Sequence, residues 1–187
     1  MHGWLRQLPN CVSSIRIFLV IPVAVTLAHH RYLATLWLFG AAGLSDALDG
    51  FLAKRFGWQT ELGGILDPLA DKLMLATVFV MLALLGSVPV WLTAVVIARD
   101  GIIVLGAILF RLLVGPIGAR PSMVSKLNTL CQILFILVVI GGLQFAWPPA
   151  WALILGALVF VTVFVSGIDY VRVYARRART QSGARAA

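Results

Sequence analysis

The chain has 187 residues, of which 61% are hydrophobic and 12% are charged, and its mean hydropathy is +0.99. These values exclude an ordinary soluble globular domain, in which about 45–50% of residues are apolar and about 25% are charged. The formal net charge of +8 fits either a nucleic-acid partner or a membrane topology signal. Composition therefore favours a membrane protein.

Predicted membrane-spanning helices occupy nearly the whole chain. A helix needs about 20 mostly apolar residues to cross the hydrocarbon layer of a bilayer, and six segments meet this requirement. They are placed at 13–30, 32–53, 66–86, 89–112, 125–146 and 149–172. We therefore predict an all-α polytopic membrane protein with one domain over residues 1–187, a basic tail at 173–187 and no separate soluble domain.

Basic residues gather on one side of the predicted membrane. The connections at 86–89 and 146–149 hold no Lys or Arg, and Arg31 is the one basic residue expected on that side. The other side receives Arg6, Arg16, Lys54, Arg55, Arg111, Arg120, Lys126, Arg172, Arg176, Arg177, Arg179 and Arg185. Cytosolic loops carry the excess of Lys and Arg, which predicts that both termini are cytosolic. The net charge is thus interpreted as topology, and no nucleic-acid partner is expected.

Four aspartates, Asp46, Asp49, Asp67 and Asp71, fall within 26 positions of a chain that has only seven acidic residues. Residues three or four apart share a helix face, so the spacing predicts two pairs of carboxylates at the cytosolic edge. Ionised carboxylates near a bilayer need a cation or lose their charge. Carboxylate oxygens suit Mg²⁺ or Mn²⁺, and two such ions roughly 3.5–4 Å apart can bridge a diphosphate. The cluster therefore predicts a metal site that acts on a diphosphate.

Small residues accompany these acids. Gly50, Ala53, Gly63 and Gly64 permit close approach of helices or of a nucleotide. Ordinary helix packing explains any one of these glycines taken alone. Their register with the acids favours the nucleotide interpretation.

The spacing Asp-x2-Asp-Gly-x2-Ala at 46–53, followed by Gly63 and by Asp-x3-Asp at 67–71, resembles the signature of the CDP-alcohol phosphatidyltransferase family. The resemblance implies transfer of a phosphatidyl group from CDP-diacylglycerol to a glycerol-containing alcohol, with release of CMP. It also implies a homodimer in a bacterial inner membrane, surrounded by membrane lipids, with the active site facing the cytosol.

The resemblance also assigns roles to individual residues. Metal ligands would be Asp46, Asp49, Asp67 and Asp71, and nucleotide contacts would come from Gly50, Ala53, Lys54 and Gly63. Asp71 would in addition be the base that accepts the proton of the acceptor hydroxyl. Lys54 departs from the family pattern, which has Arg there, and Lys lacks the bidentate geometry of Arg toward phosphate. Arg55 is a candidate substitute.

The acceptor alcohol is predicted from other segments. Leu8-Pro9-Asn10 and 14–17 resemble the start of both glycerol-3-phosphate phosphatidyltransferases and cardiolipin synthases, whereas Arg99-Asp100 and 120–129 resemble the cardiolipin synthase branch. The glycerol-3-phosphate branch is expected to carry Arg-Glu and a second Arg at the position of Ala107. A phosphomonoester with nearly two negative charges usually needs such a cationic pocket. We favour phosphatidylglycerol as acceptor, with glycerol 3-phosphate as the alternative.

Arg99, Arg111 and Lys126 are candidate contacts for the acceptor or its phosphate. Arg99 and Asp100 lie near the middle of a predicted span, where an unpaired charge costs about 2.5–3.5 kcal/mol. Either they form a buried pair between helices, or Arg99 faces a polar cavity and contacts substrate phosphate or a motif carboxylate. Both interpretations stay open.

Two other classes of function are considered. Intramembrane acids also mark ion pathways, which makes a divalent-cation transporter the alternative from another class, and a purely structural helical bundle is a second. The four acids gather at one edge of the predicted membrane, and the opposite ends of the spans offer no acidic path. This pattern favours the enzyme.

Overall fold

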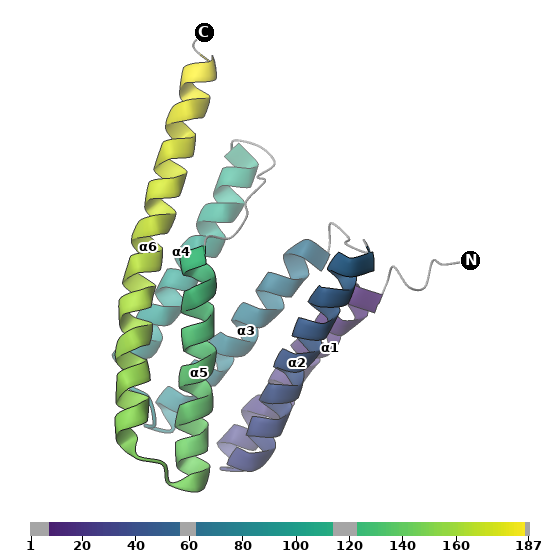
Figure 1. Ribbon diagram of the computed structural model, residues 1–187, viewed down its shortest axis with the longest axis vertical. Helices are drawn as coiled ribbons and strands as arrows, with labels where there is room; N and C mark the ends of the chain where they lie inside the picture. The colour runs from purple at the N-terminus through teal and green to yellow at the C-terminus, as the bar shows by residue number, and fades with distance from the viewer. Residues whose placement is uncertain (1–7, 57–62, 114–122, 186–187) are drawn as a thin grey trace, which may run out of the picture. The chain divides into compact units, whose positions relative to one another are not determined.

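The computed structural model describes the backbone of residues 8–56, 63–113 and 123–185, and within these ranges the side chains of 17–45, 69–106, 123–170 and 172. The described backbone forms six helices and no strand (Figure 1). The helices are α1 (Leu8–Ala28), α2 (Tyr32–Phe56), α3 (Gly63–Leu84), α4 (Val90–Leu113), α5 (Met123–Phe145) and α6 (Pro149–Arg185). The predicted all-α fold is confirmed.

The helix ends differ from the predicted ones by three residues or more at three places. α1 begins at Leu8 rather than at 13, and α6 runs to Arg185 rather than to 172. The apolar run marks where a helix meets hydrocarbon, whereas Ala and Arg in the segment after 172 are strong helix formers that continue the helix in a polar environment. The predicted basic tail is therefore helical through Arg185. The connection predicted at 54–62 is shorter, because α2 reaches Phe56 and α3 begins at Gly63.

Two helices of the described chain are long and apolar enough to cross a membrane, Met123–Phe145 and the Pro149–Tyr170 part of α6. Many apolar side chains of the second are exposed, as at Leu153, which is 76% exposed, and α5 also has exposed apolar side chains such as Leu130. Large exposed apolar surface is rare on soluble monomers and typical of a face that meets lipid. The six spans and the cytosolic termini stay predictions.

The chain divides into two compact units, of which the first contains Met1–Val90 and Ile136–Pro148. In this unit α1 contacts both α2 and α3. The turn between α1 and α2 places His30 at a φ of 56°, and beyond it the Thr35 hydroxyl donates to Thr26 Oγ1 at 3.0 Å. Val78 and Phe79 of α3 are fully buried. α1 thus packs against the two helices that carry the motif acids.

The second unit contains Trp91–Phe135 and Pro149–Ala187, and its helices alternate in direction. α4 and α6 run parallel, because Trp91 contacts Phe160 edge to face at 5.5 Å and, further along both helices, Tyr170 donates to the Ile103 carbonyl at 2.9 Å. The first half of α5 runs antiparallel to α6. Asn128 of α5 contacts Thr162 of α6, whereas Phe135, later in α5, lies against Gly156, earlier in α6. Consecutive membrane crossings produce this alternation.

Candidate active site

The four motif acids lie on two helices. α2 carries Asp46 and Asp49, and α3 carries Asp67 and Asp71, so helical geometry places each pair on one helix face. The side chains of Asp46, Asp49 and Asp67 lie outside those that the structure describes. The same holds for the predicted nucleotide contacts Gly50, Ala53, Lys54 and Gly63. Their metal-binding and nucleotide-binding roles stay predictions.

Asp71 is the one motif acid whose side chain is described. It is half-buried on α3, next to Ala70, which is 1% exposed, and one turn before Leu75, which is 5% exposed. Asp71 therefore lies beside buried residues of α3. Among the described side chains, no group of three His, Cys, Asp or Glu residues forms a metal site. Of the four motif acids, only Asp71 is among these described side chains.

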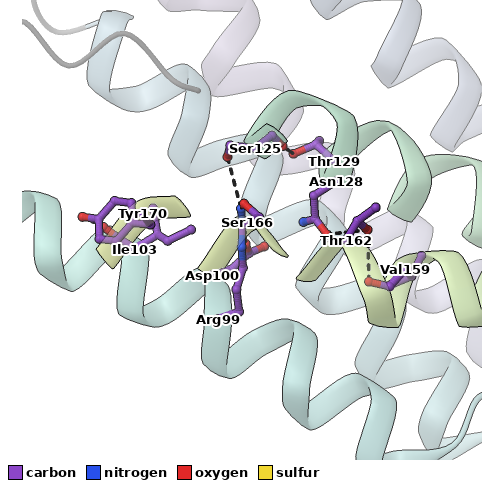
Figure 2. A network of polar contacts seen from close by, with 10 residues as sticks. All are labelled: Arg99, Asp100, Ile103, Ser125, Asn128, Thr129, Val159, Thr162, Ser166 and Tyr170. Atoms are coloured by element: carbon purple, nitrogen blue, oxygen red, sulfur yellow. Dashed lines mark hydrogen bonds and ion pairs between the residues drawn. The ribbon is translucent and has the colours of Figure 1, made fainter. Parts of the chain in front are cut away.

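Arg99 lies at the centre of a polar network in the second unit (Figure 2). Its side chain is 6% exposed, and Nη1 donates to Asp100 Oδ1 at 2.5 Å. Nη2 donates to Ser125 Oγ of α5 at 3.2 Å and also to Ser166 Oγ of α6. One guanidinium therefore joins three helices.

This geometry corrects one of the two interpretations of Arg99 and Asp100. The ion pair joins Arg99 to the next residue of α4, Asp100, and therefore forms within one helix rather than between helices. The contacts between helices go to serine hydroxyls, which are neutral. Arg99 Nε is buried and has no hydrogen-bond partner in the described structure.

A polar stripe along α5 continues the network. Ser125, Asn128 and Gln132 are spaced by three and four residues and share a helix face, and Asn128 and Gln132 are at most 1% exposed. Asn128 Oδ1 accepts a hydrogen bond from Thr162 Oγ1 at 3.0 Å. Asn128 Nδ2 and both polar atoms of the Gln132 amide have no partner among the described residues. Sequence analysis singled out 120–129 for its resemblance but missed Gln132 and the buried polar stripe, whose signal was polar residues at helical spacing in an apolar segment.

The remaining predicted acceptor contacts are not brought together by the described structure. Lys126 follows Ser125 on α5 and is exposed. Arg111 lies on α4, and its side chain is outside those described. Of the three candidates, Arg99 is the one that the structure places in a buried polar network.

Comparison with known proteins decides the family. The family model described as CDP-alcohol phosphatidyltransferase matches residues 6–166. The chain belongs to this family. It is an enzyme, a phosphatidyltransferase of phospholipid biosynthesis, and the matched range includes the four motif acids as well as Arg99 and Ser166. Family membership and the apolar helices together make it a membrane protein.

Relatives of two kinds are similar to this phosphatidyltransferase. A probable phosphatidylglycerophosphate synthase of Mycobacterium tuberculosis (strain ATCC 25618 / H37Rv) is 32% identical over 178 residues, which cover 89% of this chain and 81% of the relative. The CMP-forming cardiolipin synthase of Homo sapiens is 31% identical over 145 residues, covering 69% and 48%. The CDP-diacylglycerol–glycerol-3-phosphate 3-phosphatidyltransferase of Bacillus subtilis (strain 168) is 34% identical over 153 residues, covering 80% and 74%. The names of these relatives do not select one acceptor.

Proposed function

We propose that this phosphatidyltransferase transfers the phosphatidyl group of CDP-diacylglycerol to a hydroxyl of phosphatidylglycerol, forming cardiolipin and releasing CMP. The proposal rests on two pairs of aspartates, Asp46 and Asp49 on α2 and Asp67 and Asp71 on α3. Both pairs lie inside the range that the family model matches. Glycerol 3-phosphate is the alternative acceptor, and the names of the M. tuberculosis and B. subtilis relatives support it.

The motif acids suit a divalent cation. Asp46, Asp49, Asp67 and Asp71 provide carboxylate oxygens alone, the donors that Mg²⁺ and Mn²⁺ prefer. We propose that they hold two such ions, which when bound neutralise negative charge on the diphosphate of the donor.

Asp71 is proposed to accept the proton of the acceptor hydroxyl. As the proton leaves, the hydroxyl oxygen forms a bond to the phosphatidyl phosphorus, and the bond from that phosphorus to the CMP oxygen breaks. CMP departs with the electron pair of the broken bond. A positioned general base contributes typically 10²–10⁴-fold to the rate. Gly50, Ala53 and Gly63 are proposed to leave room for the nucleotide, and Lys54 to supply a single positive charge to its phosphates.

The preference for phosphatidylglycerol follows from the charge around Arg99. Asp100 Oδ1 already accepts a hydrogen bond from Nη1 at 2.5 Å, and this contact neutralises part of the guanidinium charge. The reduced positive charge near Arg99 suits an acceptor with one negative charge better than a phosphomonoester with nearly two. The chain has Ala at 107, where a second Arg would assist a phosphomonoester.

We also propose that all six helices cross the membrane, that both termini are cytosolic, and that the enzyme is a homodimer of the bacterial inner membrane with its active site facing the cytosol. Opposite directions of α5 and α6 in the second unit support serial crossing. Lys and Arg concentrated at alternate connections support the orientation.

Metal-dependent release of CMP tests the reaction. Purified protein in detergent, supplied with CDP-diacylglycerol, phosphatidylglycerol and Mg²⁺ or Mn²⁺, should release CMP, and a chelator should stop the release. Asp71→Asn should lower the rate at least about 100-fold through loss of the base. Asp169→Asn, which changes an acid of α6 outside the motif, is the matched control and should keep the rate. Equal rates in the two variants would refute the role of Asp71.

A further inference from the structure

A cavity of about 610 Å³ lies between α4 and α6 in the second unit. Its described lining is mostly apolar, with Val95 and Ile102 on α4 and Phe164 and Gly167 on α6. The volume falls within the range of pockets that enclose small organic ligands, roughly 300–1,000 Å³. The lining is that of a site for a hydrocarbon chain.

Two arginines lie beside this cavity, whose own surface is almost entirely apolar. Arg99 and Arg172 both line it, and no carboxylate is among its described lining residues. Arg99 is 6% exposed, and its Nε–H has no hydrogen-bond partner in the described structure. Arg172 is exposed. An apolar cavity with positive charge at its side is complementary to a molecule that joins a hydrocarbon chain to an anion.

Arg172 of α6, and Arg99 of α4 through its contact with Ser166 of α6, lie at two levels that match those of a phospholipid. Arg172 lies 23 residues after Pro149, or about 34 Å along the helix at 1.5 Å per residue. A span of that length crosses the roughly 30 Å of hydrocarbon and reaches the level of the phosphates. Ser166, which Arg99 contacts, precedes Arg172 by six residues, about 9 Å closer to the membrane interior. Arg99 therefore lies below the phosphate level, toward the chains.

We propose that this cavity holds an acyl chain of the phospholipid acceptor, phosphatidylglycerol. Arg172 binds its phosphodiester at the level of the headgroups. This inference rests on the proposed function, in which the diphosphate of the donor belongs to the aspartate motif and a lipid with one phosphodiester remains to be placed. Glycerol 3-phosphate has no chain to fill an apolar cavity of this volume.

Gly167 offers a way to fill the cavity without disturbing its walls. It lines the cavity, and a Cβ added to it would meet no atom within 4 Å. Gly167→Phe therefore places a ring in the space assigned to the chain. Gly101→Phe is the matched control, because Gly101 is an exposed residue of α4, also has no atom within 4 Å of an added Cβ, and does not line the cavity.

Binding of phosphatidylglycerol is measured without donor, by native mass spectrometry of the full-length protein in detergent, with phosphatidylcholine as the zwitterionic comparison. Gly167→Phe should weaken phosphatidylglycerol binding about tenfold, because a displaced lipid loses its charged hydrogen bond to Arg172. Gly101→Phe should stay within about twofold of the unmodified protein. Arg172→Gln should remove the preference for phosphatidylglycerol over phosphatidylcholine while Gly101→Phe retains it.

Two results separate this inference from the proposed function. Equal binding of phosphatidylglycerol by Gly167→Phe and Gly101→Phe would overturn the cavity assignment, even if the enzyme makes cardiolipin. Loss of binding in Gly167→Phe, in a protein that makes phosphatidylglycerophosphate and no cardiolipin, would refute the lipid as acceptor and with it the acceptor role of the cavity.

Discussion

Replacement of Arg99 by methionine should lower the free energy of unfolding of the second unit by more than the loss of any one of the Arg99 contacts would. The variant keeps an unbranched apolar stem but loses the ion pair to Asp100 at 2.5 Å and the bonds to Ser125 and Ser166. Removing one partner of a buried ion pair costs about 3–5 kcal/mol. Asp100 is 17% exposed, which favours the lower end. The two serine bonds add about 0.6 kcal/mol each, so the expected loss is about 4 kcal/mol.

The double variant Arg99→Met/Asp100→Asn isolates the contribution of charge. It removes both charges of the ion pair, and replacing both members of a buried pair is often nearly neutral. Its expected loss is about 1 kcal/mol, from the serine bonds alone. Unfolding of the purified proteins in mixed micelles of increasing SDS content measures both free energies, and Asp100→Asn completes the double-mutant cycle. Additive effects of the two single substitutions would refute the ion-pair reasoning.

Two further predictions concern packing and hydrogen bonds between helices. Gly141→Ala should destabilise the first unit by about 1–3 kcal/mol, because an added Cβ would lie 2.7 Å from Trp147 Cη2. Gly142→Ala, whose Cβ meets no atom within 4 Å, should instead gain up to about 1 kcal/mol from helix propensity. Thermal unfolding in detergent measures the melting temperatures of both variants, and equal values would contradict the packing. Thr162→Val should cost about 0.6–1.7 kcal/mol by removing the bond to Asn128; an unchanged SDS unfolding midpoint would show that this bond contributes nothing.

The apolar runs of the sequence predict that six helices exist, but not where they end. Apolarity reports contact with hydrocarbon, and helix ends depend on propensity and capping as well. The polar segment after 172 shows the difference, because it continues α6 to Arg185 without contributing to an apolar run. The predicted limits of α2 and α3 miss residues near the motif for the same reason.

The motif acids and the partners of Arg99 differ in how far local sequence predicts them. Asp67 and Asp71 are four residues apart, so a helix alone places them on one face. Ser125 and Ser166 contact Arg99 across 26 and 67 positions, a relation that depends on the register of three helices. The cavity between α4 and α6 arises from the same packing, and composition alone does not reveal it.

The central claim is tested most directly by identifying the lipid that the purified enzyme forms. CDP-diacylglycerol and Mg²⁺ or Mn²⁺ are supplied with phosphatidylglycerol in one reaction and with glycerol 3-phosphate in a parallel one, and the lipid products are identified by mass spectrometry alongside CMP. We expect cardiolipin and stoichiometric CMP in the first reaction and little phosphatidylglycerophosphate in the second. Phosphatidylglycerophosphate in the second reaction, with no cardiolipin in the first, would contradict the proposed acceptor, and no CMP in either would contradict the proposed reaction.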